Sequence, residues 1–283
     1  MVDVSVVVLT MGDRPQELAD AIGSARDQAG VSIEVVLVVN GGTPDTSIAD
    51  VVVEPGENLG IPGGRNAGAD ASNGTLVCFL DDDGALADSV LAPALEAFTA
   101  YDRLAVIGLR VVDPSGATAR RHVPGLRSDA DTSRAATSFP GGASIVRRTT
   151  FDQVGGLCGP FRYGLEETDL AWRLLDAGWD IQYRADLQMT HPRTSPTRHK
   201  AFFVDTARNR VWLAHRTLPI PLAVVYVTAW TLVTTARNLR RPGAIIAHLR
   251  GTAVGLRGPI GPRRPMRWRT VWKMARLGRP PVI

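Results

Sequence analysis

The chain has 283 residues, 45% hydrophobic and 21% charged, a composition typical of a globular protein that excludes wholesale disorder. Two cysteines without a CxxC pair exclude a disulfide framework and fit a reducing compartment. The first residues lack the basic segment and apolar core of a signal peptide, so none is expected. The net charge of +4 hides an asymmetry, because 15 Lys or Arg and no Asp or Glu follow Asp205. A basic tail on an acidic body suggests an anionic partner, either nucleic acid or a membrane face.

The first part of the chain alternates apolar runs with a segment of helical spacing. Near-continuous apolar runs predict strands at 4–9, 34–39 and 51–53, because strands covered on both faces lose polar alternation. Apolar residues three to four positions apart predict a helix over 16–28. This β-α-β-β order begins a Rossmann-like nucleotide-binding half. No G-x-G-x-x-G follows the first strand, so a dinucleotide site is disfavoured.

Three consecutive carboxylates, Asp81, Asp82 and Asp83, follow an apolar run over 76–80 that predicts a buried strand. Open α/β sheets bind ligands at the carboxyl ends of their strands. Three like charges repel unless a positive group lies among them, and the expected group is a hard divalent cation, which takes oxygen ligands. Such a cation is well placed to hold a diphosphate. The alternative is a solvated acidic turn.

A glycine-rich segment, 57–68, precedes that strand. Its four glycines and two asparagines allow the backbone to approach a ligand closely. Pro62 suits the first turn of a helix that would run to about Ser72. Arg65 in that turn is a planar donor suited to phosphate or carboxylate. A glycine turn with a packing role is the alternative.

After the three aspartates, the pattern predicts a helix over 89–100 and a strand over 104–112. Residues 117–138 are polar, Arg-rich and aperiodic, which is typical of a surface excursion, and loops of this length are often lids or binding loops. A glycine turn then enters a strand at 141–146, followed by a short helix over 147–154.

A second group of carboxylates, Glu166, Glu167 and Asp169, opens another segment of helical spacing. Glu166 and Asp169 share a polar face with Arg173, whereas Glu167 is tilted towards the apolar side. Acidic residues in a first turn also complement the helix macrodipole, so a structural role is the alternative. His191 follows a predicted strand at 180–183 and further apolar residues; such a histidine is more often structural than a ligand.

The tail contains two apolar stretches and a basic cluster. Residues 218–236 carry no charge and reach the length of a membrane span, but Pro219 and Pro221 shorten the expected helix to about 222–236. We therefore expect an interfacial or re-entrant helix. A second apolar stretch at 244–256 precedes a cluster of a kind that attracts anionic lipid, and a basic hairpin packed on the body is the alternative. The cluster consists of Arg263, Arg264, Arg267, Arg269, Lys273, Arg276 and Arg279, with Trp268 and Trp272 interleaved.

The motifs occur together and in order over about residues 2–200, and the chain resembles an inverting family 2 glycosyltransferase with the GT-A fold. It is most similar to the rhamnosyl- and galactofuranosyl-transferase branch that builds bacterial surface glycans. The residues that carry the resemblance are Thr10, Asn58, Gly60, Arg65, Asn66, Gly68, Asp81, Asp82, Asp83, Gly141, Gly142, Ala143, Glu166, Glu167, Asp169, Leu170 and His191.

The resemblance implies a role for each motif. Asp81 and Asp83 would hold Mn²⁺ or Mg²⁺, with His191 completing the metal shell, and the metal would neutralise the leaving nucleoside diphosphate. Glu167 stands where the family has its catalytic Asp and would take the proton of an acceptor hydroxyl, with Glu166 and Asp169 as alternative bases. The nucleotide sugar would contact Thr10, Asn40 (often Asp in the family), Asn58, Gly60, Arg65, Asn66, Asp81, Asp82, Gly141 and Gly142.

These features predict a metal-dependent inverting glycosyltransferase of bacterial cell-surface polysaccharide synthesis. It would move a sugar from a UDP- or dTDP-linked donor to a hydroxyl of a glycan or lipid-linked acceptor. The predicted fold is α/β, a GT-A catalytic domain at 1–205 with a Rossmann-like mixed sheet and helices on both faces. Residues 206–283 would form a basic apolar helical region. We expect a cytoplasmic protein attached peripherally to the inner face of the cell membrane, with no nucleic acid partner.

Two other interpretations stay open. A polyprenyl-phosphate sugar synthase would explain the membrane tail, but a phosphate acceptor needs no base and leaves the carboxylates at 166–169 unexplained. A non-catalytic nucleotide-sugar or nucleic-acid binder would use the basic tail. Intact carboxylates at every catalytic position argue against this second interpretation.

Overall fold

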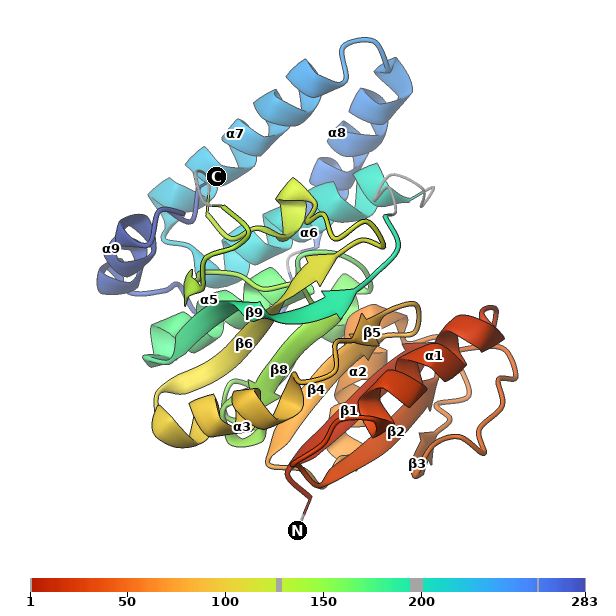
Figure 1. Ribbon diagram of the computed structural model, residues 1–283. Helices are drawn as coiled ribbons and strands as arrows, with labels where there is room; N and C mark the ends of the chain where they lie inside the picture. The colour runs from red at the N-terminus through yellow and green to blue at the C-terminus, as the bar shows by residue number, and fades with distance from the viewer. Residues whose placement is uncertain (1, 126–128, 194–200, 259, 283) are drawn as a thin grey trace.

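The computed structural model describes residues 2–125, 129–193, 201–258 and 260–282 (Figure 1). One mixed sheet forms its centre, in the order β3-β2-β1-β4-β8-β6-β9-β5, with β7 paired to β9. Strands β1 to β4 pair in parallel, and β8 runs antiparallel between β4 and β6. The strands are β1 (Val4–Thr10), β2 (Ile33–Val39), β3 (Val51–Val53), β4 (Leu76–Asp81), β5 (Ala85–Leu86), β6 (Leu104–Val112), β7 (Arg134–Ala135), β8 (Ala143–Arg147) and β9 (Asp180–Thr190).

Helices cover both faces of the sheet, which explains why its strands are apolar without alternation (Figure 1). Val6 of β1 packs in a cluster with residues of α1 and α3, whereas its neighbour Val7 packs on the opposite face with residues of α2, α4 and α5. The helices of this body are α1 (Pro15–Arg26), α2 (Gly60–Ala71), α3 (Leu91–Ala100), α4 (Arg148–Gln153) and α5 (Glu166–Ala177). The predicted α/β architecture with helices on both faces is therefore confirmed.

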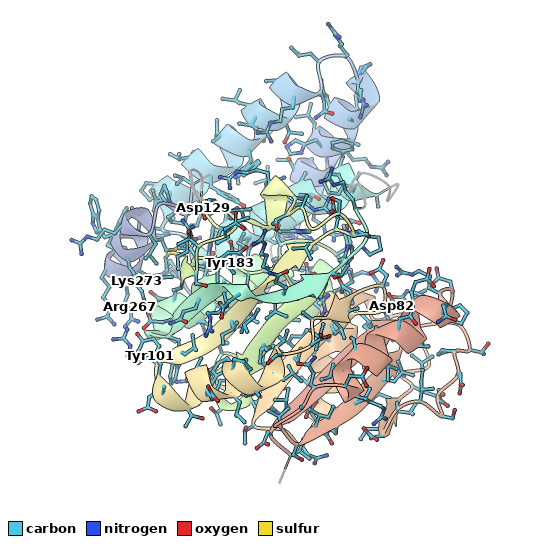
Figure 2. The ribbon with its side chains drawn as sticks, viewed as in Figure 1. Asp82, Tyr101, Asp129, Tyr183, Arg267 and Lys273 are labelled. Atoms are coloured by element: carbon cyan, nitrogen blue, oxygen red, sulfur yellow. The ribbon has the colours of Figure 1, made fainter. Side chains whose placement is uncertain are left out.

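Four further helices follow, α6 (Phe202–Thr217), α7 (Ile220–Arg237), α8 (Pro242–Arg257) and α9 (Trp268–Arg276). Helices α7 and α8 form a hairpin that extends away from the sheet (Figure 1). Gly251 and Gly255 let α8 approach α6 closely, since a Cβ at either position would meet the backbone of α6. Helix α9 is tied to the body through Lys273, which donates to Asp180 at 2.6 Å beside Tyr101 (Figure 2).

Two sequence predictions differ from the structure. The apolar helix of the tail is longer than predicted and begins at Ile220, because Pro221 lies in its first turn, where the missing N–H costs nothing. Strand β9 continues to Thr190 instead of ending near Tyr183, because its alternating burial persists along the whole segment. The division into domains at residue 205 stays a prediction; that residue lies within α6.

Candidate active site

A cavity of about 770 Å³ opens beside the carboxyl ends of β1, β2, β4 and β9, a size suited to a small-molecule ligand. Its walls also include part of the 117–138 excursion, the start of α5, the start of α6 and the chain beyond α9. The residues predicted as site residues that line it are Thr10, Asn40, Asn58, Gly60, Arg65, Asp81, Asp82, Asp83, Gly141, Gly142, Glu166, Glu167 and His191.

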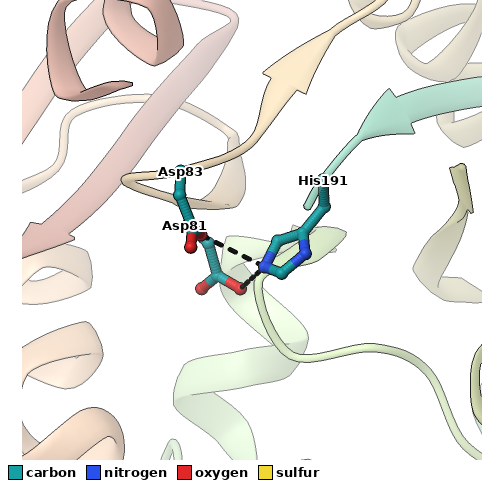
Figure 3. A group of neighbouring side chains, drawn as sticks. All are labelled: Asp81, Asp83 and His191. Atoms are coloured by element: carbon teal, nitrogen blue, oxygen red, sulfur yellow. Dashed lines mark ion pairs between the residues drawn. The ribbon is translucent and has the colours of Figure 1, made fainter. Parts of the chain in front are cut away.

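Asp81, Asp83 and His191 come together at one point of this cavity (Figure 3). His191 Nε2 lies 3.1 Å from Asp83 Oδ1 and 3.8 Å from Asp81 Oδ2. The pairing of Ala85 in β5 with Thr190 in β9 brings Asp83 and His191 together, since Asp83 lies two residues before Ala85 and His191 directly follows Thr190. Asp81 joins them from the end of β4. Octahedral ligands about 2.1 Å from Mg²⁺ lie about 3 Å apart, so two carboxylates and an imidazole at these distances fit a divalent cation.

Two arginines supply positive charge among the three aspartates. Arg14, just before α1, donates from Nη2 to Asp82 Oδ1 at 2.7 Å and also pairs with Asp83. Arg65 of α2 donates from Nη2 to Asp81 Oδ1 at 2.7 Å and is buried. The net charge of the three carboxylates and two guanidinium groups is one negative. A divalent cation would leave the cluster net positive, which favours a bound diphosphate.

The pKa values of Asp82 and Asp83 shift in opposite directions. Burial raises the pKa of Asp82 to about 6, although the hydroxyl of Thr10, 2.8 Å from Asp82 Oδ2, and the charge of Arg14 oppose the shift. Burial also raises the pKa of Asp83, but the hydrogen bond and charge of His191, with those of Arg14, outweigh it and lower that pKa. The hydrogen bond to Asp83 raises the pKa of His191 in turn.

Gly141 and Gly142 make room for the charged groups. A Cβ on Gly142 would overlap the carboxylate of Asp81, and a Cβ on Gly141 would come 2.5 Å from Arg65 Nη1. Gly60 has a φ of +74°, and a Cβ there would meet the backbone of Arg162. The predicted glycine-rich character of the site therefore has a steric cause, the close approach of these charged groups and loops.

Glu166 and Glu167 begin α5 and both line the cavity. One oxygen of each carboxyl, Oε2, is buried without a hydrogen-bond partner among the described residues. Burial raises the pKa of both groups; the charge of Glu167 raises that of Glu166 further, while the charge of Arg65 lowers both. The interaction between the two carboxyls raises the pKa of Glu166 and lowers that of Glu167, which makes Glu167 the better candidate for an ionised base.

Asp169 and Asn66 do not line the cavity. Both carboxylate oxygens of Asp169 are engaged, one by Arg173 at 2.6 Å and the other by Arg216 at 3.0 Å. Asn66 exchanges two hydrogen bonds with the backbone of Leu157, which fastens α2 to the loop before α5. These contacts favour structural roles for both residues rather than the catalytic and ligand-binding roles predicted for them.

The asparagines on the β2 side shape the loop before α2. Asn40 accepts from Leu59 N at 2.8 Å and donates to the side chain of Asn58 and to Gly60 O. Asn58 in turn accepts from Gly60 N at 2.8 Å. Their amide groups therefore hold the wall of the cavity beside Thr10, where the resemblance places the nucleotide.

Sequence reasoning missed three contributions. It gave Arg14 no role, although the three aspartates required a positive group and an arginine just before the first helix was a candidate. It treated α6 as part of the tail, whereas Asn209 of α6 donates to the carbonyls of Phe161, Tyr163 and Gly164, the loop that leads into α5.

The third missed contribution is the inward packing of the 117–138 segment, which was predicted as a surface excursion. Val123 and Ala136 of this segment are buried, and His122 lines the cavity. Burial lowers the pKa of His122 to about 4, so this imidazole is neutral at physiological pH. The polar composition of the segment concealed this inward packing.

The central mixed sheet, with helices on both faces and carboxylates at its strand ends, has the GT-A fold. Residues 5–169 match the Glycosyl transferase family 2 profile, and the chain belongs to this family. No curated protein matches the chain.

The fold is similar to that of several solved structures. Staphylococcus aureus TarS aligns with a TM-score of 0.55 and 19% identity over 75% of this chain and 39% of TarS. Its fragment 1–349 in complex with UDP aligns with a TM-score of 0.54 and 19% identity over 75% of this chain and 65% of the fragment. GalNAc-T7 with UDP, GalNAc and Mn²⁺ aligns with a TM-score of 0.60 and 14% identity over 75% of this chain and 47% of that protein. The chain thus spans less than half of TarS or GalNAc-T7, and the likeness at these identities concerns the fold.

Proposed function

We propose that this protein is a metal-dependent inverting glycosyltransferase that transfers a sugar from a nucleoside-diphosphate donor to an acceptor hydroxyl. The observation that carries the proposal is the convergence of the Asp81, Asp83 and His191 cluster with the Glu166 and Glu167 pair in one cavity. A divalent cation supplies charge stabilisation of the leaving diphosphate when bound. TarS fragment 1–349 and GalNAc-T7 were each solved with UDP, and the latter with Mn²⁺, which supports a UDP-linked donor.

Each residue then has a defined task. Asp81, Asp83 and His191 hold the cation, while Arg14 keeps Asp82 and Asp83 in place. Glu167 accepts the proton of the acceptor hydroxyl as its oxygen attacks the anomeric carbon. Of the three bases that the sequence left open, Glu166 serves as the protonated neighbour and Asp169 is fully occupied by arginines.

The decisive experiment compares donor binding with transfer. Purified protein is screened with nucleotide sugars for Mn²⁺-dependent thermal stabilisation and for donor hydrolysis, because a ligand of the native state raises apparent stability. We expect UDP-sugars, or dTDP-sugars, to stabilise the protein only with metal. Absence of any metal-dependent nucleotide effect would refute the proposal.

The identity of the base is tested with Glu167→Gln. This variant should bind the donor with metal as the wild type does and lose transfer by about a hundredfold or more, the usual contribution of general base catalysis. Glu96→Gln, an exposed glutamate of α3, is the matched control. Normal transfer by the Glu167 variant would instead favour a polyprenyl-phosphate acceptor, which needs no base.

We further propose that the C-terminal helices bind the cytoplasmic face of an anionic membrane. Among the described residues α7 is the one helix long and apolar enough to cross a bilayer, and only 6% of it is buried. Its exposed apolar residues recur at helical spacing, with Ile220 and Leu232 each about two-thirds exposed. Trp268 and Trp272 of α9 are exposed beside Arg269, the combination of an interfacial helix.

Vesicle flotation tests this surface. The protein should float with phosphatidylglycerol-containing vesicles, bind neutral phosphatidylcholine vesicles far less, and dissociate as salt is raised. Replacing Trp268 and Trp272 together by alanine should weaken the flotation. Equal binding to neutral vesicles, or none to anionic ones, would contradict the proposal. The narrower resemblance to rhamnosyl- and galactofuranosyl-transferases, and a role in cell-surface glycan synthesis, fit a membrane-bound enzyme and stay part of this proposal.

A further inference from the structure

Arg279 lines the cavity although it comes from the far end of the chain. Gly278, with a φ of +80°, ends α9 in the left-handed conformation, and Arg279 N donates to Met274 O. The chain thereby turns back, and Arg279 Nη1 donates to Ser138 Oγ at 2.9 Å. The end of the chain and the end of the 117–138 excursion therefore meet at the wall of the cavity.

The surroundings of Arg279 differ from those of Arg14 and Arg65, the two arginines that neutralise the aspartates of the cavity. Arg14 and Arg65 pair with aspartates, whereas no carboxylate of the described residues forms a salt bridge with Arg279. Burial lowers the pKa of Arg279, the charge of Tyr226 opposes this shift, and the like charge of Arg120 adds to it. A half-buried guanidinium without a carboxylate partner is costly unless an anion compensates it.

The position of Arg279 separates it from the candidate donor subsite. The asparagines and the metal cluster that would hold the donor follow β1, β2, β4 and β9. Figure 1 shows α9, the helix that Arg279 follows in the chain, on the other side of the molecule from β1, β2 and β3. Arg279 and Ser138 line the cavity from the chain beyond α9 and from the 117–138 excursion, not from the strand ends that carry the metal cluster, so we assign them to the part of the cavity left for an acceptor.

We propose that Arg279 binds an anionic group, a phosphate or a carboxylate, carried by the sugar acceptor. A guanidinium presents a planar fork of donors that matches either group. Ser138 Oγ orients this fork, and the anion compensates the charge of Arg279. The inference rests on the proposed function, because it requires a donor in the remainder of the cavity.

The test uses the full chain and four probes, titrated with and without saturating UDP and Mg²⁺. Glucose 1-phosphate carries a phosphate, glucuronate a carboxylate, glucose no charge, and inorganic phosphate no sugar. We expect the wild type to bind at least one of the two anionic sugars about tenfold more tightly than glucose, the size of one charge-assisted hydrogen bond. Whichever of these two binds identifies the anion, and inorganic phosphate shows whether the sugar contributes.

Variants assign the effect to Arg279. Arg279→Gln should abolish the preference for the anionic sugar, and Arg279→Lys should retain part of it. Arg26→Gln removes an exposed arginine of α1 that does not line the cavity, and it should leave binding of all four probes unchanged. Thermal unfolding verifies that each variant is folded. If Arg279→Gln is not folded, the assignment to Arg279 depends on two other results: a reduced preference in Arg279→Lys, and weaker wild-type binding of the anionic sugar as salt is raised.

The outcomes are distinct. Equal binding of glucose and both anionic sugars by the wild type, or an unchanged preference in Arg279→Gln, would overturn the inference. Competition between UDP and the anionic sugar would assign Arg279 to the donor diphosphate and would also overturn it. Failure of UDP and Mg²⁺ to bind at all would instead count against the proposed function.

Discussion

The carboxylate of Asp81 occupies the space that a side chain on Gly142 would need. Gly142 therefore determines where one of the candidate metal ligands can lie. Gly142→Ala should push Asp81 away from His191 and weaken divalent cation binding by about tenfold or more, the range for residues that support metal ligands. Calorimetric titration with Mn²⁺ measures this loss. Gly23→Ala, in α1 with open space around its position, should leave metal affinity unchanged.

The metal cluster itself predicts metal-dependent nucleotide binding. Asp83→Asn and His191→Gln each remove one ligand, so UDP binding in the presence of Mn²⁺ should weaken by about tenfold or more. Asp186→Asn, which alters a carboxylate paired with Arg184 on β9, is the matched control. Addition of EDTA should reduce wild-type UDP affinity as far as Asp83→Asn does. Wild-type UDP affinity that is insensitive to EDTA would show that the cluster holds no functional cation.

The paired glutamates make stability depend on pH. Burial raises the pKa of Glu166 and Glu167 in the folded protein above the ordinary value of about 4.3. The folded state then binds more protons than the unfolded state, and the free energy of unfolding falls as pH rises through the window between the two pKa values. Below that window both carboxyls are protonated in the folded and unfolded states, and their contribution to the free energy of unfolding is fully present.

Glu166→Gln removes part of this pH dependence because its amide stays neutral. The variant should gain stability relative to the wild type as pH rises from about 5 to about 9, measured as the midpoint of thermal unfolding. Glu96→Gln should follow the wild-type profile. A difference between Glu166→Gln and the wild type that stays constant with pH would mean that the pair is not protonated in the folded protein.

Asn209 holds the loop that presents the two glutamates. Its side-chain amide donates to three carbonyls of a loop in which Arg162 and Leu165 adopt positive φ values of 57° and 71°. Asn209→Ala should lower the free energy of unfolding by about 2 kcal/mol, the cost of leaving buried acceptors unpaired. Asn238→Ala removes one local hydrogen bond in the α7–α8 connection and should cost far less. Chemical denaturation compares the two variants.

Much of the fold followed from local pattern. The apolar runs at β1, β2 and β4 predicted strands covered on both faces, and the packing of Val6 and Val7 on opposite faces confirms it. The helix at Glu166 followed from apolar spacing, and it ends at Gly178, which adopts a φ of +101°. The two-residue strand β5 escaped prediction, because two residues carry no periodicity.

The site was predicted as residue types, and its assembly depended on long-range pairing. The sequence by itself determined that three carboxylates end a buried strand, that a positive group must lie among them, and that a carboxylate pair opens a later helix. Only the tertiary structure decided that Arg14 and Arg65 supply positive charge there, that β5 brings His191 to Asp83, and that Asp169 is engaged by Arg216.

The physical reason for this division is the distance along the chain over which each interaction acts. Strand and helix patterns reflect neighbours within a few residues, whereas charge pairing and burial depend on which distant segments meet. Arg279 is the extreme case, since its approach to Ser138 joins positions 141 residues apart. Composition alone assigned this arginine to a basic tail, and the fold brought it to the wall of the cavity.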